Sequence, residues 1–220
     1  MNRMAKREVF LVSSKNEFLK EQVQFDWARM KDKQQRKQIS VKNLHNAYLQ
    51  YNEHSQILEV STASQNKLGK AASAFNLDIK TTHGIFTVEQ LFQASKNFEL
   101  SGTNEKLLYG SSQQAKKSVK HKQKNDRLIN FKLFGHAYPL TPKTLFYNYL
   151  YCNAMWQNPE LAMQIVKYDV FTDINFNDKY GINCQAEACS IFTSLCRKLE
   201  LEKALSSFNN FKKLVYGKQY

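Results

Sequence analysis

The chain alternates short apolar runs with longer stretches in which apolar residues recur every three or four positions. Runs rich in β-branched and aromatic residues at 9–12 and 57–61 predict two short strands. An apolar segment at 75–79, a turn at Gly84 and a second apolar segment at 85–88 predict a β-hairpin. The pattern therefore predicts a small β-sheet.

Helical periodicity covers more of the chain than strand periodicity does. It predicts helices at residues 41–51, 88–98, 112–122, 142–157, 159–167, 184–199 and 202–216. The sequence shows no internal repeat, and its 7 glycines and 3 prolines leave little room for linkers. We therefore expect an α+β fold, predominantly helical, formed by a single domain over residues 1–220.

The predicted helix at 88–98 concentrates polar groups on one side. Glu89, Gln93 and Lys96 lie at positions i, i+4 and i+7, so on a helix their side chains share one face. Val88 and Leu91 lie on the other side, where their burial can hold the helix in place. The polar stripe predicts a site in a cleft, and the alternative is an ordinary exposed ion pair.

The charge of the chain favours a polyanionic partner. Its formal net charge is +13, from 32 Lys and Arg against 19 Asp and Glu. The excess is concentrated at residues 29–42 and 116–127, which we interpret as nucleic-acid-binding stretches rather than merely solvated faces. The candidate DNA-binding residues are Lys116, Lys117, Lys120 and Lys122.

The cysteines and apolar runs argue against several other classes. Cys152, Cys184, Cys189 and Cys196 form no Cys-x-x-Cys pair, and no histidine lies at zinc-finger spacing from them. We expect reduced thiols and no metal, and the absence of a glycine-rich phosphate loop predicts no cofactor. Without a signal peptide or a membrane-length apolar run, we expect a cytoplasmic protein with no membrane association.

Three segments, in this order, resemble one protein family. Ser-Ala-Phe-Asn-Leu at 73–77 precedes Val-Glu-x-x-Phe-Gln-x-x-Lys-x-Phe at 88–98, and Ser-Ser-Gln-Gln-Ala-Lys-Lys follows at 111–117. The combination resembles the NADAR (YbiA-like) family, whose members are N-glycosidases acting on ribosyl-type linkages. The family core corresponds to residues 61–201. Residues 1–60 resemble the N-terminal part of the branch that accompanies DarT-type DNA ADP-ribosyltransferase toxins, and 202–220 form a C-terminal helix.

The chain also departs from the common family pattern. Asn97 separates Lys96 from Phe98, whereas many relatives place Lys and Phe side by side. A late Trp-Gly-x-Gly element is missing, and Tyr-Asp-Val-Phe-Thr-Asp-Ile at 168–174 and Asn-Cys-Gln-Ala at 183–186 stand there instead. This substitution resembles the toxin-associated branch.

The resemblance implies an ADP-ribosyl-guanine hydrolase that removes ADP-ribose from guanine bases in DNA, as antitoxin to a DarT-type toxin. Cleaving such a bond develops positive charge on the ribose and negative charge on the departing base. The matching residues are Glu89, as general acid/base or cation stabiliser, and Lys96, which either orients Glu89 or attacks the open sugar as an amine. A toxin bound directly is a further candidate partner.

The candidate substrate-binding residues are Gln93, Asn76, Phe75, Asp173, Asn183 and Gln185. Gln93 is expected to bind ribose or base, and Asp173 to bind ribose hydroxyls or act as a second carboxylate, unless it caps a turn. Asn183 is expected to cap the helix at 184–199, whose N-terminus then suits a diphosphate. Asn76 is either a ligand-facing amide or a turn residue.

Two alternative functions remain. An N-glycosidase of a small ribosyl metabolite, such as a riboflavin-pathway intermediate, would use the same catalytic helix but would not require two basic stretches. A non-catalytic nucleic-acid-binding module would explain the charge but would not explain Glu89 and Lys96 on one helix face.

Overall fold

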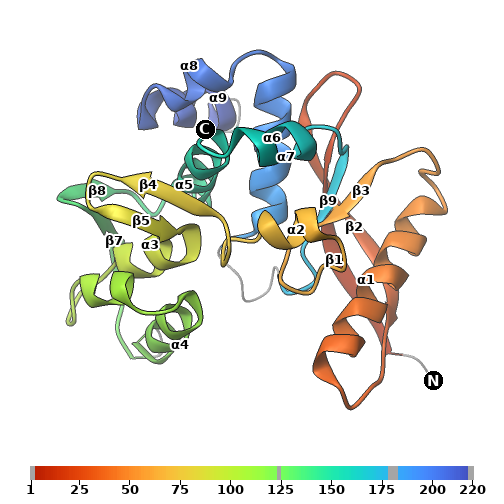
Figure 1. Ribbon diagram of the computed structural model, residues 1–220, viewed down its shortest axis with the longest axis horizontal. Coiled ribbons are helices and arrows are strands. Elements are labelled where there is room, and N and C mark those ends of the chain that lie inside the picture. The colour runs from red at the N-terminus through yellow and green to blue at the C-terminus, as the bar shows by residue number, and fades with distance from the viewer. Residues whose placement is uncertain (1–2, 123–124, 178–182, 218–220) are drawn as a thin grey trace.

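The computed structural model describes residues 3–122, 125–177 and 183–217. One side of the molecule is a four-stranded sheet with the order β2-β1-β9-β3. Its strands are β1 (Arg3–Val12), β2 (Phe18–Trp27), β9 (Val170–Thr172) and β3 (Ile57–Glu59). β1 and β2 are antiparallel, whereas β3 and β9 are parallel. Figure 1 shows this sheet at the right of the view, with α1 (Lys33–Leu49) beside it.

The strands predicted at 9–12 and 57–61 are confirmed, but β2 was not predicted. β2 lies at the edge of its sheet, and of its 10 residues only Phe25 is buried. An edge strand with so little burial lacks the apolar alternation by which strands are identified. Val41, Leu44 and Tyr48, on the partly apolar face of α1, pack against the hairpin formed by β1 and β2.

Two smaller sheets lie at the other side of the molecule (Figure 1). β4 (Asp78–Thr81) and β5 (Gly84–Thr87) form the predicted hairpin, in which Gly84 has a φ of +133° that favours glycine. The third sheet has the order β6-β7-β8 and was not predicted. It consists of β6 (Lys96–Phe98), β7 (Leu128–Leu133) and β8 (His136–Tyr138).

The predicted helix at 88–98 is too long by three residues. α3 spans Val88–Ser95, and Lys96–Phe98 continue as β6. Its start is as predicted, because Thr87 and Gln90 form a reciprocal capping box. β6 forms because it pairs with β7, a pairing to which the Asn97–Asn130 side-chain hydrogen bond adds (3.0 Å). Lys96 therefore leaves the helical stripe.

The remaining helices include those predicted at 112–122, 142–157, 159–167 and 184–199, with differences of a few residues at most of their ends. They are α2 (Lys67–Ala71), η1 (Glu105–Tyr109), α4 (Ser112–Lys122), α5 (Leu145–Trp156), α6 (Pro159–Ile165), α7 (Gln185–Arg197), α8 (Leu201–Leu205) and α9 (Phe208–Tyr216). Neither α2 nor η1 was predicted. The single helix predicted at 202–216 is wrong, because Ser207 begins α9 as its N-cap, where its side chain accepts from the Asn210 amide.

The main core surrounds α3, α5 and α7. Phe92 of α3 packs beside Phe131, Phe146 and Tyr147, and α7 contributes Phe192 to the same core. A second core lies between α1 and the four-stranded sheet. The α+β class is confirmed, and the two cores fix α3 and the ends of β3 and β9 as rigid supports for one cavity.

Candidate active site

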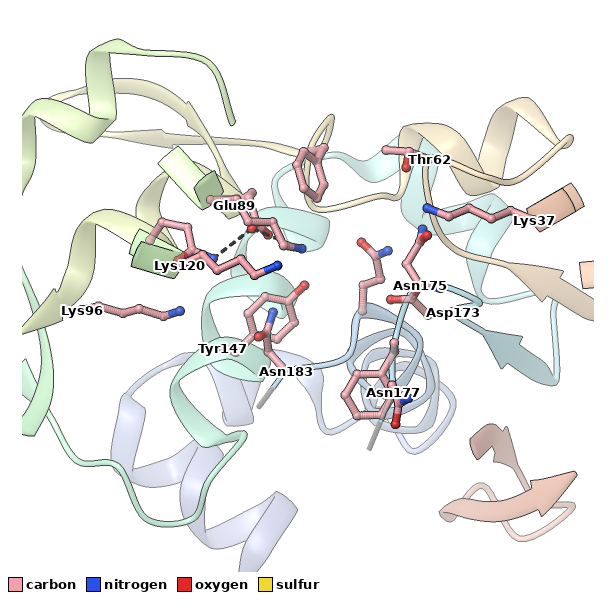
Figure 2. Close-up of a pocket in the computed structure, with 15 residues that line it drawn as sticks. Lys37, Thr62, Glu89, Lys96, Lys120, Tyr147, Asp173, Asn175, Asn177 and Asn183 are labelled. Carbon is pink, nitrogen blue, oxygen red and sulfur yellow. Dashed lines mark hydrogen bonds and ion pairs between the residues drawn. The ribbon is translucent and has the colours of Figure 1, made fainter. Parts of the chain in front are cut away.

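A cavity of about 620 Å³ opens where α3, α4, α5, α7 and the ends of β3 and β9 converge. Its volume lies in the range of small-molecule sites. Its lining residues are Lys37, Thr62, Phe75, Glu89, Gln93, Lys96, Lys116, Lys120, Tyr147, Asp173, Asn175, Phe176, Asn177, Asn183 and Gln185. Figure 2 shows two walls, with Glu89, Lys96 and Lys120 on one side and Asp173, Asn175 and Lys37 on the other.

Glu89 is the centre of the first wall. Its side chain is only 2% exposed, and its Oε1 accepts a hydrogen bond from Gln93 Nε2 at 2.9 Å. Lys116 Nζ lies 3.7 Å from the same oxygen and 4.9 Å from the centre of the Phe75 ring. The other amide atom, Gln93 Oε1, is buried and has no hydrogen-bond partner within the described structure. Gln93 thus holds Glu89 and leaves an acceptor for a ligand.

Lys96 reaches the same cavity from β6. The residue is 5% exposed, and its Nζ lies 4.8 Å from the centre of the Phe92 ring. Burial lowers the pKa of Lys96 to about 8, because desolvation penalises the ammonium; Glu89 opposes this shift and Lys116 adds to it. A lysine with this pKa supplies both an ammonium and a neutral amine near neutral pH.

Asp173 lies on the second wall, directly after β9. It is 8% exposed, and the Asn175 amide donates to its Oδ1 at 2.9 Å. Burial raises the pKa of Asp173 to about 6, although the Asn175 amide and the Lys116 cation oppose the shift. The cavity therefore offers two carboxylates, with Lys116 acting electrostatically on both.

Gln185 is hydrogen-bonded to the turn that carries Phe75. Gln185 is the first residue of α7, and its Oε1 accepts hydrogen bonds from the Ala74 amide (2.8 Å) and Ser73 Oγ (3.3 Å). These bonds attach the turn that carries Phe75 to the start of α7. The sequence segments at 73–77 and 183–186 thus meet at one end of the cavity.

A comparison with protein-family models identifies the chain. The model described as DarT1-associated NADAR antitoxin matches residues 5–220. The chain belongs to the family of DarT1-associated NADAR antitoxins. No curated protein sequence matches it significantly.

In this NADAR antitoxin, most of the predicted site residues line the cavity and others lie outside it. The structure brings eight of them into the cavity: Glu89, Lys96, Gln93, Phe75, Asp173, Asn183, Gln185 and Lys116, with Lys120 at its rim. Asn76 lies outside it, because its Nδ2 donates to the Lys70 carbonyl and its side chain faces a different hollow beside α6. Lys117 is exposed on α4 and does not line the cavity, and the side chain of Lys122 falls outside the described residues.

One expected role changes, and one residue has an additional contact. Asn183 is not the N-cap of the last long helix, as was expected, because Cys184 occupies that position and makes no side-chain capping bond. Asn183 lines the cavity instead, beside Tyr147 (Figure 2). Lys116, expected to bind the DNA backbone, also pairs with Glu89 at 3.7 Å; its side chain stays 57% exposed, and its contact with DNA stays a prediction.

Sequence reasoning missed Tyr147. It lies on α5, which the sequence predicts as a helix with no site residue, yet its hydroxyl faces the cavity (Figure 2). Burial raises its pKa well above the ordinary value, and Glu89 and Asp173 reinforce this. Tyr147 therefore stays protonated and is a hydrogen-bond donor. Thr62, Asn175, Phe176 and Asn177 were also missed, because they follow strands that are too short to be located by pattern.

Two features are absent from the described residues. None of their helices is both long and apolar enough to cross a membrane. Within the same residues, no three His, Cys, Asp or Glu side chains form a group that could hold a metal ion. The polar side-chain groups that line the cavity are carboxylates, amines, amides, the Thr62 hydroxyl and the Tyr147 phenol.

Proposed function

We propose that the protein hydrolyses the N-glycosidic bond between ADP-ribose and guanine in DNA and so reverses the modification made by a DarT-type transferase. Membership of the DarT1-associated antitoxin family supports the biological role. The observation that carries the chemistry is the convergence of Glu89 and Lys96 on one wall, opposite Asp173, in a single cavity.

The first step uses the lowered pKa of Lys96. Glu89 accepts the proton of the Lys96 ammonium and then delivers it to the ribose ring oxygen as the ring opens. The lone pair of the guanine nitrogen supplies the electrons, so that the anomeric carbon becomes the carbon of a protonated imine. The Lys96 amine adds to this carbon.

The second step releases the base. A proton moves from the former lysine amine to the guanine nitrogen, the bond from that nitrogen to the anomeric carbon breaks, and a Schiff base between ADP-ribose and Lys96 remains. Water hydrolyses the Schiff base, returning free Lys96 and ADP-ribose. Tyr147, as a protonated phenol, donates a hydrogen bond inside the cavity, and Asp173 is placed to hold ribose hydroxyls.

The charged rim supports DNA as the substrate. Lys120 from the second basic stretch and Lys37 from the first line the cavity on opposite sides (Figure 2). A second hollow, lined by Lys33, Gln34, Lys37, Thr62 and Ala63, continues from the cavity along α1. Phosphates on either side of a modified nucleotide would therefore meet lysines on both flanks.

The test is product identification. An oligonucleotide carrying one ADP-ribosylated guanine is incubated with the protein, and both products are identified by mass spectrometry. The proposal predicts free ADP-ribose and an intact, unmodified guanine, and borohydride added during turnover should attach the sugar to Lys96. The control variant Lys120→Gln, which changes a neighbouring cavity lysine, should still form the adduct at Lys96.

If the oligonucleotide kept its ADP-ribose and no free ADP-ribose appeared, the proposal would be contradicted. Hydrolysis of small ribosylamines at a higher kcat/KM than the modified oligonucleotide would support the metabolite glycosidase instead. Tight DNA binding without any bond cleavage would support the binding module.

A further inference from the structure

A second buried carboxylate lies behind the Asp173 wall. Glu59 ends β3, is 3% exposed and does not line the cavity. Its Oε1 accepts hydrogen bonds from Ser61 Oγ (2.5 Å) and from the Ile174 amide (2.9 Å). Its Oε2 lies 2.6 Å from Thr172 Oγ1, a hydroxyl that can donate to the carboxylate or accept from the protonated acid. Both oxygens of this carboxyl group are thus used inside the protein.

These bonds join the two segments that form the second wall. β3 and β9 are parallel neighbours, with Glu59 opposite Thr172, so the chain leaves both strands at the same edge of the sheet. The segment after β3 carries Thr62, and the segment after β9 carries Asp173 and Asn175, all of which line the cavity. One carboxyl group therefore holds both segments at fixed positions.

Glu59 and Asp173 also interact through their charges. Burial and repulsion from Asp173 raise the pKa of Glu59 to about 8, above the value of about 6 for Asp173. Asp173 lines the cavity and the Lys116 cation favours its charged form, whereas Glu59 is enclosed behind it, so the first proton lost by the pair comes from Asp173. At neutral pH the negative charge of the pair therefore belongs to the residue that faces the cavity.

The surrounding groups are consistent with a protonated Glu59. On the α1 side His45 Nε2 lies 2.9 Å from Thr172 Oγ1, and burial lowers the pKa of His45 to about 4, so the ring is neutral. A hydroxyl both donates and accepts, so Thr172 can accept from protonated Glu59 and donate to His45. The other groups that face Asp173 are Lys116 from α4, Gln185 and Cys184 from α7, and Tyr147 from α5.

We propose that Glu59 is a positioning residue for the Asp173 wall: it holds the segments after β3 and β9 together and keeps the proton, which leaves Asp173 as the charged partner for ligand. The proposal rests on the proposed function only in its choice of ADP-ribose as the ligand. Ionisation of Glu59 would place a second negative charge behind the cavity proposed to bind ADP-ribose, which is itself an anion, and ADP-ribose affinity would fall.

Glu59→Gln is the informative variant, since its amide oxygen can accept from Ser61 and Ile174 while its NH₂ group mimics the protonated acid. Isothermal titration of ADP-ribose should give affinities at pH 7 within about three-fold of wild type, because the variant copies the neutral group. Between pH 7 and 9 the wild type should lose roughly three- to ten-fold more affinity than the variant. Lys96 also titrates near pH 8 in both proteins, so the difference between the two curves reports Glu59.

Parallel curves for the two proteins would overturn the proposal, since a purely structural Glu59 would not alter the pH dependence. Carboxyl-carbon NMR titration of the wild type provides a reading that needs neither a stable variant nor bound ligand. A Glu59 resonance that titrates near pH 8, above Asp173, supports the proposal, and titration of Glu59 below pH 5 contradicts it. Failure of ADP-ribose to bind would contradict the proposed function and leave this NMR test intact.

Discussion

Burial changes what a lysine can do. An exposed lysine is almost wholly protonated at pH 7, whereas Lys96, with a pKa of about 8, is a neutral amine in roughly a tenth of molecules. The Phe92 ring and the enclosed position remove water from the ammonium without removing access to the cavity. The neighbouring Glu89 limits the shift and also supplies the group that takes the proton.

This pKa predicts the pH dependence of turnover. The proposed first step moves the Lys96 proton through Glu89 to the ribose ring oxygen, so kcat/KM should be level just below pH 8 and fall about ten-fold per pH unit above it, where that proton has already been lost. Lys96→Arg keeps the positive charge but removes the amine, so its rate should fall by roughly a hundred-fold or more while ADP-ribose still binds. An active Arg variant that keeps its rate above pH 8, where the guanidinium stays charged, would instead assign Lys96 an electrostatic role.

The cysteines should not take part in the chemistry. Cys152, Cys184 and Cys189 are buried, and burial raises the pKa of each thiol, which disfavours the reactive thiolate. Treating the folded protein with iodoacetamide at pH 7.5 should therefore leave the rate of ADP-ribose release unchanged. Rapid inactivation, traced by peptide mapping to Cys184 beside Asn183, would show that a thiol acts in the site.

At the level of elements, the site depends on a change from helix to strand. α3 carries Glu89 and Gln93, and the next residue after the helix, Lys96, already pairs in β6 with Phe131 of β7. The sequence predicted that these three side chains would share a cleft, and they do. The predicted reason, a shared helix face, does not hold for Lys96, because Lys96 lies in β6. The amphipathic pattern continues to Phe98, and only pairing with a strand far along the chain ends the helix.

The contact between α2 and β3 predicts a stability effect. A Cβ at Gly69 would overlap the backbone carbonyl of Glu59 and the side chain of Ser64. Gly69→Ala should therefore lower the free energy of unfolding by about 1–3 kcal/mol, because the backbone of β3 must shift. Chemical denaturation measures the loss, and Lys67→Ala, an exposed change on the same short helix, should stay within about 0.5 kcal/mol of wild type. A Gly69→Ala variant as stable as wild type would show that α2 moves freely.

At the level of the whole molecule, the two basic stretches lie on opposite sides of the cavity. Figure 1 shows α4 and α1 on opposite sides of the molecule, and Figure 2 shows Lys120 and Lys37 facing the space between the walls. The sequence identified both stretches by charge. It could not show that Lys116 turns inward to Glu89, because that contact depends on how α4 packs against α3.

Lysines that do not line the cavity should affect the binding of DNA but not the cleavage reaction. Lys33 and Lys117 are exposed on α1 and α4. Changing both to Gln should weaken oligonucleotide binding by roughly ten-fold at low salt. The slope of log affinity against log salt should fall by the equivalent of about one to two phosphate contacts. Turnover of free ADP-ribosyl-guanosine should not change. The matched control, Lys203→Gln with Lys212→Gln on α8 and α9, removes the same charge elsewhere and should bind DNA nearly as wild type does. Equal weakening by both pairs would mean that net charge, not a located surface, attracts DNA.

The most direct measurement is single-turnover release of ADP-ribose from guanine-modified DNA by wild type, Glu89→Gln and Lys96→Ala. We expect complete release by wild type and rates at least about a hundred-fold lower for each variant, because each variant lacks a group that moves a proton or forms a bond. ADP-ribose affinity should change by no more than about three-fold in Glu89→Gln, which preserves shape and hydrogen bonding. Near wild-type release by both variants would contradict the account and move the search to Asp173 and Asn183 on the rest of the cavity surface.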